Sequence, residues 1–267
     1  MTDTPKIDAP LVDVNVHLSR WPARRLPGDE TPELVERLRA ADVVQAWVGS
    51  FDALIHRDIA GVNERLVEET RTHGDGMLIP FGAVNPRLPD WKEDLRRCHE
   101  QYKMPGVRLY PGYHGYTLAD DAFAALLADA AERELIVQLA VKLEDERTQP
   151  TALRAATVDL APLPKLLSSP AAPPMVLLNA MRTLSAAQAC DLAEAGDVYF
   201  EIAMLEGVGG VERLLKEFPH ERLLFGSHFP FFYLESALLK LRESSLPNFQ
   251  RQALLHGNAR RLLPVAS

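Results

Sequence analysis

The chain has 267 residues, which is long enough for one large barrel or two small domains. Hydrophobic residues make up 47% of it, and the formal charge of −8 without a dense lysine–arginine cluster argues against a nucleic-acid-binding protein. The start, Met1-Thr2-Asp3-Thr4-Pro5-Lys6, lacks an apolar signal core, and no run reaches the length of a membrane span. With Cys98 and Cys190 expected as free, buried thiols in helices, we expect a cytoplasmic protein that binds neither nucleic acid nor membranes.

Short apolar runs alternate with amphipathic stretches along the chain. We predict strands over 11–17, 43–49, 77–84, 105–110, 135–141, 174–179, 197–203 and 222–227. We predict helices over 31–41, 57–72, 89–103, 120–133, 159–168, 184–195, 207–218, 233–243 and 247–256, the last ending before Gly257. Strands of nearly continuous valine, isoleucine and leucine are typical of a parallel sheet that is buried on both faces.

Eight strand–helix units indicate a single α/β domain over residues 1–267, a (β/α)8 TIM barrel. The alternative is a doubly wound open sheet, which would typically have a glycine-rich phosphate turn after its first strand. The chain has Leu18-Ser19-Arg20-Trp21-Pro22 there instead. The longest irregular stretch, about 142–158, follows the fifth strand, and long loops on a barrel are often functional.

A (β/α)8 barrel carries its active site at the C-terminal ends of the strands, and polar residues stand at these positions. They are Asn15, His17, Ser50, Asp52, Asn85, Arg108, Tyr110, Gln138, Glu144, Asn179, Glu201 and His228. Since the first and last strands are neighbours in a closed barrel, we expect His17 and His228 to approach each other across its mouth.

Several of these residues have both a structural and a functional interpretation. An arginine inside an apolar strand needs a partner, so Arg108 either forms a salt bridge to Glu201 or Glu144 or clamps a substrate carboxylate. Gln138 and Asn179 either form hydrogen bonds inside the barrel or orient a substrate.

Three loops have the same two interpretations. The segment 111–116, which contains His114, is either a plain turn or an aromatic wall of the site. The run Glu144-Asp145-Glu146-Arg147 is either solvated or brings Glu144 or Arg147 to the site. The segment 21–25 is either a lid edge or packing, and 229–233 is expected to be core with one ring facing a ligand.

Three segments resemble the amidohydrolase superfamily, in particular its amidohydrolase-related branch, amidohydrolase 2. They are Asp13-Val14-Asn15-Val16-His17, Gly106-Val107-Arg108-Leu109-Tyr110-Pro111 and 221–230, and the tail 257–263 also fits. The resemblance covers nearly the whole chain. It implies a metal-dependent-hydrolase-like barrel and a hydrolase, decarboxylase or lactonase of small polar molecules. Many members bind one or two divalent metals, and the family often forms dimers.

The chain departs from the family's metal-ligand pattern at four positions. Asn15 stands at the first histidine of the first-strand His-x-His motif, and Gln138 and Asn179 replace histidines of the fifth and sixth strands. His228 replaces the eighth-strand aspartate, which is a metal ligand and general base in the family. Arg108 cannot serve as the carboxylated strand-four lysine of some members, because its guanidinium stays protonated. We therefore expect no two-metal site.

The resemblance and its departures together predict a hydrolase that cleaves a C–N or C–O bond of a small polar or anionic molecule. We predict His228, His17 and Arg108 as catalytic residues. The predicted substrate-binding residues are Asn15, Tyr110, His114, Gln138, Glu144, Asn179 and Glu201. No cofactor is favoured, with His228 as a metal-free base. The alternative is one divalent metal such as zinc on His17, His228 and Glu201.

Two further hypotheses stay open on the same barrel. One is a decarboxylase or lactonase, and the other is a non-catalytic binding protein whose metal site has decayed. Under each hypothesis, the resemblance implies a homodimer. Random decay should have placed apolar residues in the mouth, yet Asn15, Gln138, Asn179 and His228 are all polar. This pattern favours a retained site with altered chemistry.

Overall fold

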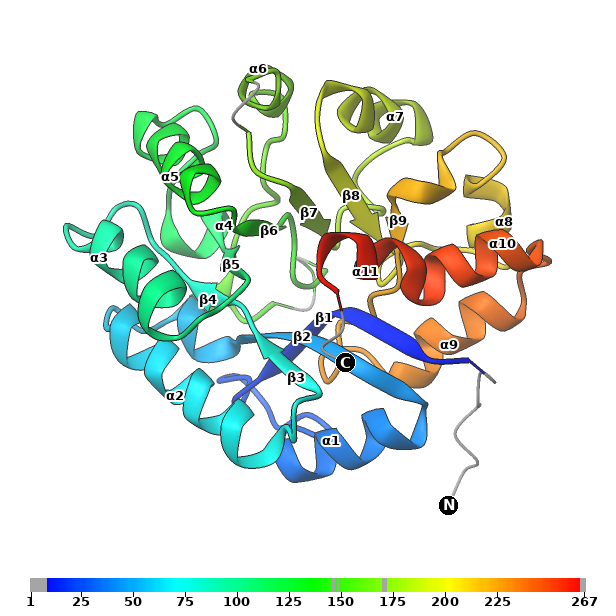
Figure 1. Cartoon of the computed structure of the whole chain (residues 1–267), viewed down its shortest axis with the longest axis horizontal. Coiled ribbons are helices and arrows are strands. Elements are labelled where there is room, and N and C mark those ends of the chain that lie inside the picture. Colours follow the sequence, from blue (N-terminus) through cyan, green and yellow to red (C-terminus); the bar gives the residue numbers. More distant parts are fainter. Residues whose placement is uncertain (1–8, 146, 148, 170–171, 265–267) are drawn as a thin grey trace.

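The computed structural model describes residues 9–145, 147, 149–169 and 172–264. Parallel strands surround a central axis and helices form a ring outside them (Figure 1). The strands are β1 (Leu11–Leu18), β2 (Val43–Ser50), β3 (Leu78–Pro80), β4 (Gly82–Ala83), β5 (Gly106–Leu109), β6 (Ile136–Ala140), β7 (Met175–Leu178), β8 (Val198–Glu201) and β9 (Leu223–Leu224). Nearly every strand residue is buried, as expected for a sheet that is covered on both faces.

Backbone hydrogen bonds join the strands into a closed barrel. The strands β3 and β4 are two parts of one predicted strand, interrupted at Phe81, whose N–H donates to the Val48 carbonyl at 2.8 Å. At the other seam, Val14 N–H donates to Phe225 O (3.0 Å) and His17 N–H donates to Phe229 O (2.9 Å). With β3 and β4 counted as one strand, the described residues therefore form the predicted eight-stranded ring.

The main helices follow the predicted order, with shorter bounds in several places. They are α1 (Thr31–Ala40), α2 (Ile59–His73), α3 (Trp91–Arg96), α5 (Asp121–Glu132), α6 (Leu163–Leu167), α7 (Ala186–Ala195), α8 (Gly210–Leu214) and α9 (Leu234–Arg242). Short helical turns are η1 (Phe51–Leu54), η2 (Arg97–Gln101), α4 (Pro111–His114), η3 (Thr151–Leu153) and η4 (His220–Arg222). In α5, the buried residues Phe123, Leu126, Leu127 and Ala130 recur at helical spacing and face the core.

The C-terminal helix does not end before Gly257 as predicted. The segments α10 (Asn248–Gln252), η5 (Ala253–Gly257) and α11 (Asn258–Leu262) follow one another without a break. Gly257 has a right-handed helical φ of −59°, so it continues the helix instead of capping it. The Asn258 amide donates to the His220 and Leu223 carbonyls, each at 2.6 Å, and this ties the continuation to β9.

The two cysteines differ in exposure. Cys98, in η2, is buried, and burial raises the pKa of its thiol to about 12. Cys190, in α7, is only partly buried, which corrects the expectation of two buried thiols. Both are free. No helix among the described residues has the length and apolar character needed to cross a bilayer.

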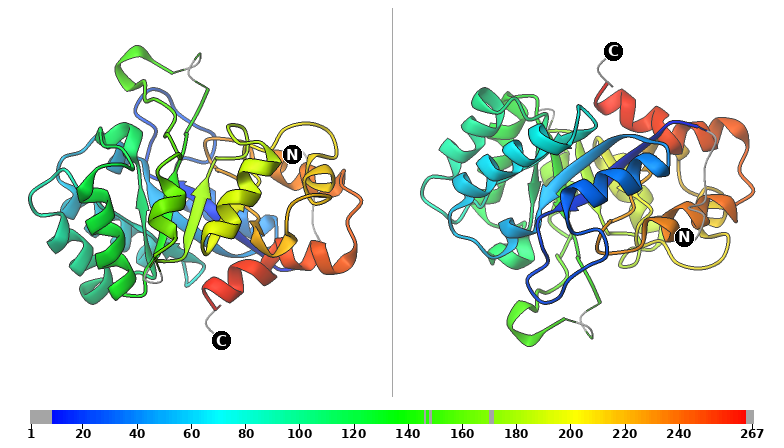
Figure 2. Two further views of the ribbon diagram at one scale, coloured as in Figure 1. Left: turned by 90° about the horizontal axis from the view of Figure 1, so that it is seen from above. Right: turned by 90° about the horizontal axis from the view of Figure 1, so that it is seen from below.

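An apolar cluster covers the C-terminal end of the barrel. It contains Trp21, Leu26, Phe51, Leu143 and Phe231, which come from the segments after β1, β2, β6 and β9. Figure 2 shows that the segment after β1 and the long segment after β6 project from the same side of the barrel. These two segments meet over the end of the barrel where the polar residues lie.

Candidate active site

His17 and His228 lie together at the C-terminal end of the barrel, as their places on the first and last strands predict. Their ring centroids are 5.2 Å apart and the rings meet edge to face at 78°. Both side chains are completely buried. The backbone N–H of His228 donates to the backbone carbonyl of Asn15 at 2.8 Å, and this bond joins the segment after β9 to β1 next to the two rings.

The hydrogen bond of His228 determines its tautomer. Its Nε2 lies 2.8 Å from the Leu143 carbonyl oxygen, and because a carbonyl only accepts, Nε2 is the protonated nitrogen. Nδ1 then carries a lone pair, and it is buried without a hydrogen-bond partner among the described residues. Burial lowers the pKa of His228 to about 3, so the ring is neutral at pH 7. His228 is therefore a buried neutral base.

Two site residues have left-handed backbone conformations. Asn179, directly after β7, and His228, after β9, each have a φ of 60°. This conformation is accessible to asparagine but uncommon for histidine, and such strain gathers at functional sites. In both cases the left-handed residue follows the C-terminal end of a parallel strand.

His17 is held between an aromatic ring and a permanent cation. Its ring stacks on Phe51 with centroids 4.6 Å apart and planes 9° apart, and Arg108 Nη1 lies 3.3 Å from His17 Nε2. Burial, followed by the positive charge of Arg108, holds the pKa of His17 well below its usual value. His17 is thus a second neutral ring.

Arg108 directs its N–H groups at the protein itself. Nε donates to Gln138 Oε1 (2.7 Å), Nη1 donates to Val16 O (2.8 Å), and Nη2 donates to Trp47 O (3.0 Å) and Val14 O (3.4 Å). A salt bridge to Glu201 or Glu144, one of the two alternatives for Arg108, is absent from the ion pairs among the described residues. Because carbonyl oxygens accept from the guanidinium N–H groups on each side, Arg108 presents no pair of N–H groups for a substrate carboxylate.

The remaining amides join a network around Glu201. The Asn15 amide donates to Asn179 Oδ1 (3.0 Å) and to Glu201 Oε1 (3.2 Å), and the Asn179 amide donates to Lys142 O (2.7 Å). The backbone N–H groups of Asn179 and Ala203 donate to the Glu201 carboxylate. Burial outweighs these bonds and raises the pKa of Glu201 to about 7. Asn15 Oδ1 remains buried without a partner among the described residues.

The other predicted substrate-binding residues lie on the wall of the mouth. Tyr110 is buried, with its ring centroid 6.3 Å from that of His17. His114, in α4, has Nε2 2.8 Å from the Ala53 carbonyl. Glu144 is almost completely buried, with its carboxylate 3.5 Å from Arg24. The neighbouring Glu146 lies outside the described residues.

Three strand-end residues instead form local contacts. Ser50 Oγ lies 2.8 Å from Ser19 Oγ, and the Asp52 carboxylate is 3.6 Å from Arg65. The Asn85 side chain accepts from the backbone of Arg87.

One buried acid was missed by the sequence interpretation. Asp13 is completely buried, and its Oδ1 accepts backbone N–H bonds from Asn15 (3.1 Å) and Ser227 (3.0 Å). Burial raises its pKa to about 6. The signal was a charged side chain inside an apolar strand, and the same signal marked Arg108. Asp13 fastens β1 to the segment after β9 and so fixes the spacing of the two histidines.

Aromatic rings separate the histidines from solvent. Phe231 stacks on His228 at 5.1 Å, and Trp21 packs edge-on against Phe231 (5.1 Å) and Phe51 (5.5 Å). A cavity of about 620 Å³ lies beside the site. Its lining includes Ser227, Phe231 and Phe232, so these residues stand between the cavity and His228.

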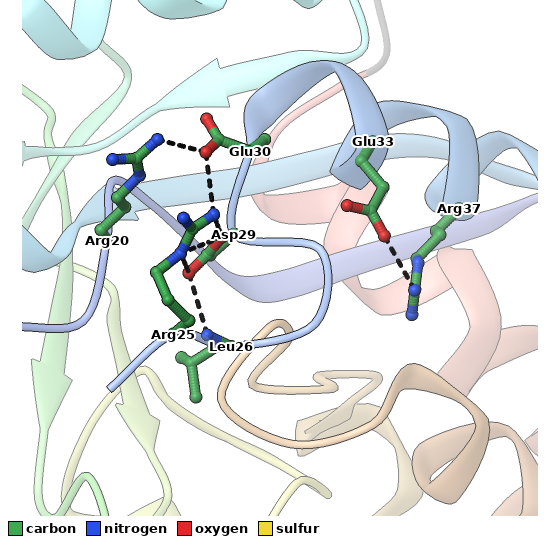
Figure 3. Close-up of polar contacts among 7 residues, drawn as sticks. All are labelled: Arg20, Arg25, Leu26, Asp29, Glu30, Glu33 and Arg37. Atoms are coloured by element: carbon green, nitrogen blue, oxygen red, sulfur yellow. Dashed lines mark hydrogen bonds and ion pairs between the residues drawn. The ribbon is translucent and has the colours of Figure 1, made fainter. Parts of the chain in front are cut away.

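The covering segment after β1 is held by its own ion pairs. Arg25 binds Asp29 in a bidentate manner, and Asp29 also accepts from Leu26 N–H at 2.9 Å (Figure 3). Arg20 and Arg25 both reach Glu30. Arg24 contacts the Phe231 ring, with its guanidinium carbon 5.2 Å from the centroid. Segment 21–25 therefore lies over the site, and Trp21 and Arg24 pack directly against its aromatic rings.

Residues 12–265 match the family model that is described as amidohydrolase. The chain belongs to this family. The match spans all the barrel strands from the second residue of β1 onward, and it confirms the resemblance that the strand-end motifs indicated. No curated protein matches the chain.

Solved structures with the same fold include several decarboxylases. The 5-carboxyvanillate decarboxylase of Sphingomonas paucimobilis is 10% identical, with a TM-score of 0.72 over 96% of this chain and 99% of that one. The 2,6-dihydroxybenzoate decarboxylase of Rhizobium is 14% identical, with a TM-score of 0.69 over 94% and 98%. A dihydroxybenzoic acid decarboxylase of Polaromonas sp., solved with manganese, is 13% identical, with a TM-score of 0.69 over 95% and 96%. At these identities the likeness establishes the TIM-barrel fold.

The donor set of this amidohydrolase family member does not fit a metal ion. Glu201 is directed at N–H donors, the protonated Nε2 of His228 is bound to a carbonyl, and a guanidinium lies beside His17. A divalent cation there would meet the positive charge of Arg108 at close range. Among the described residues, no three histidine, cysteine or acidic side chains are grouped as a metal site requires.

Proposed function

We propose that this amidohydrolase family member is an enzyme that hydrolyses a C–N or C–O bond of a small polar or anionic molecule, with His228 as the general base. One observation carries the proposal: His228 Nδ1 is a neutral, fully buried nitrogen that has no hydrogen-bond partner in the part of the chain that the structure describes, and its tautomer is fixed by the Leu143 carbonyl. Buried polar atoms are normally paired in native proteins, so an unpaired base at the mouth of a barrel points to a ligand or a reacting water.

In this proposal, His228 Nδ1 accepts a proton from water while the water oxygen adds to the substrate carbonyl carbon. The proton then passes from Nδ1 to the departing nitrogen or oxygen. The Leu143 carbonyl keeps Nε2 protonated and the ring oriented throughout, which is the role an orienting group plays for any catalytic histidine. Asn15 Oδ1, on the adjacent strand, has no hydrogen-bond partner among residues that the structure describes and can accept a hydrogen bond from the substrate.

Binding requires movement of the aromatic cover. Phe231 lies against His228, and Trp21 packs on Phe231, so a substrate reaches Nδ1 only after these rings move. The cavity of about 620 Å³ behind Phe231 and Phe232 provides space into which the rings can swing. Lids over active sites commonly move in this manner.

Decarboxylation is the second candidate, because several proteins of the same fold are decarboxylases. A decarboxylase must return a proton to the carbon that loses carbon dioxide. A neutral His228 has no proton on Nδ1 to give, so the geometry favours hydrolysis. The two reactions differ in their products.

The test is a panel of small lactones, amides, esters and hydroxybenzoates, incubated with the purified protein and followed by mass spectrometry and carbon dioxide release. His228→Asn is the variant, and His73→Asn, on the outer helix α2, is the matched control. We expect hydrolysis products from the wild type and the control only. Carbon dioxide release would support the second candidate. Binding without turnover across the panel would instead support a non-catalytic binding protein.

A further inference from the structure

Arg108 is surrounded by oxygen atoms from three strands. Val14 and Val16 of β1 and Trp47 of β2 contribute backbone carbonyls, and Gln138 of β6 contributes its side-chain oxygen. The guanidinium is completely buried. Carbonyl oxygens converging on one centre form the kind of environment that stabilises a cation, and here the cation is part of the protein.

The neighbouring residues make room for this cation and orient its partners. A Cβ at Gly49 would lie 2.8 Å from Arg108 Cδ, so a glycine leaves the space that the arginine stem fills. Gln138 accepts from Arg108 through Oε1 and donates through Nε2 to Val14 O at 2.8 Å. Gln138 thus links the guanidinium to the backbone of β1, with its acceptor toward Arg108 and its donor toward Val14.

Arg108 also contacts two positions of the family's metal-ligand pattern. Its guanidinium lies 3.3 Å from His17 Nε2 and 2.7 Å from Gln138, where the pattern has a fifth-strand histidine. Two completely buried carboxylates, Asp13 and Glu201, interact electrostatically with Arg108 and offset its charge. The barrel centre therefore already holds a fixed positive charge beside two positions of that pattern.

We infer that Arg108 is the resident cation of this barrel, a fixed guanidinium that takes the place of the divalent metal and positions His17 and β1. It is a positioning residue, because its N–H groups donate to acceptors of the protein. This inference does not depend on the proposed hydrolysis, since it concerns which cation occupies the barrel centre.

The test is chemical rescue of Arg108→Ala, read by melting temperature and by elemental analysis. We expect the variant to melt several degrees below the wild type. Millimolar guanidinium, far below denaturing concentrations, should restore part of the loss, while equal concentrations of urea, zinc or manganese should not. Arg96→Ala, which removes a partly exposed arginine on α3, is the control in which guanidinium should restore nothing. Equal rescue by urea, or rescue by a metal alone, would overturn the inference.

The wild-type protein supplies a second readout if Arg108→Ala does not fold. Purified wild type should contain no stoichiometric metal, and its melting temperature should not respond to chelator, zinc or manganese. Arg108→Lys keeps the charge but loses the fork, so it should fold with a lower melting temperature and still bind no metal. Stoichiometric metal in the wild type that His17→Ala removes would contradict the inference.

Discussion

The Nε2 atom of His228 donates to the Leu143 carbonyl at 2.8 Å, which joins the last strand end to the long segment after β6. This bond leaves Nδ1 as the unprotonated nitrogen of a neutral ring. In ¹⁵N spectra at pH 7, His228 should therefore show one protonated nitrogen, Nε2, and one bare nitrogen, Nδ1. Signals of an imidazolium, or the opposite tautomer, would show that the ring is held differently.

Stability should respond to pH through His228. Its folded pKa of about 3 lies below the ordinary 6.5, so between these values the unfolded chain binds a proton that the folded chain does not. The contribution to the free energy of unfolding is therefore complete above about pH 7 and falls as the pH decreases toward 3. At pH 5 the loss is about 2 kcal/mol.

Denaturant titrations of the wild type and His228→Gln between pH 5 and 7.5 measure this effect. The other buried titratable groups are present in both proteins. The difference between their free energies of unfolding therefore isolates the effect of His228. As the pH decreases, the free energy of unfolding of the wild type should fall relative to that of His228→Gln. A difference that stays constant across this range would contradict a buried neutral His228.

Substitution of Glu201 should disturb the amide network. In Glu201→Gln, one terminal oxygen becomes an NH2 group that faces the N–H donors of Asn179, Ala203 or Asn15. A buried donor without an acceptor costs about 1–3 kcal/mol. Urea denaturation should show this loss, whereas the exposed Glu100→Gln on η2 should change the free energy of unfolding by less than about 0.5 kcal/mol.

The left-handed conformation of Asn179 predicts an order among its variants. Asn179→Gly accepts a φ of 60° but loses the bonds to Asn15 and Lys142, so it should destabilise by about 1–2 kcal/mol. Asn179→Val loses the same bonds and adds backbone strain of about 1–3 kcal/mol. If the Asn179→Val variant proved as stable as the Asn179→Gly variant in thermal denaturation, the left-handed backbone would not explain why asparagine occupies this position.

Removal of Arg24 should loosen the cover over the site. Arg24 lies 3.5 Å from Glu144 and contacts the Phe231 ring, and its side chain is nearly half exposed, so the pair is worth at most about 1 kcal/mol. Arg24→Ala should therefore speed hydrogen exchange in residues 19–30 while leaving the melting temperature almost unchanged. Arg39→Ala, from an exposed ion pair with Asp75, should leave that exchange as it is.

The barrel could be predicted from the sequence because its strands are continuous apolar runs that repeat with helices between them. The meeting of His17 and His228 followed from their positions on the first and last strands. The end of the C-terminal helix could not be predicted from Gly257, because tertiary bonds from Asn258 to the His220 and Leu223 carbonyls carry the chain past it.

The role of Arg108 depends on partners that are remote in sequence. Its acceptors are main-chain carbonyls of β1 and β2, and every residue type has such a carbonyl, so no residue pattern marks them. For the same reason, the Leu143 carbonyl that orients His228 could not be predicted. The closed mouth likewise depends on how Trp21 and Phe231 pack together across segments that are distant in the chain.

The central claim is that His228 acts as a base without a metal. The most direct test is the turnover, by metal-stripped protein, of a substrate found in the panel, compared between the wild type and His228→Asn. We predict full wild-type turnover after removal of metal and a loss of at least about 100-fold in the variant. Turnover that disappears with chelation and returns with zinc or manganese would contradict the claim, as would an unimpaired His228→Asn enzyme.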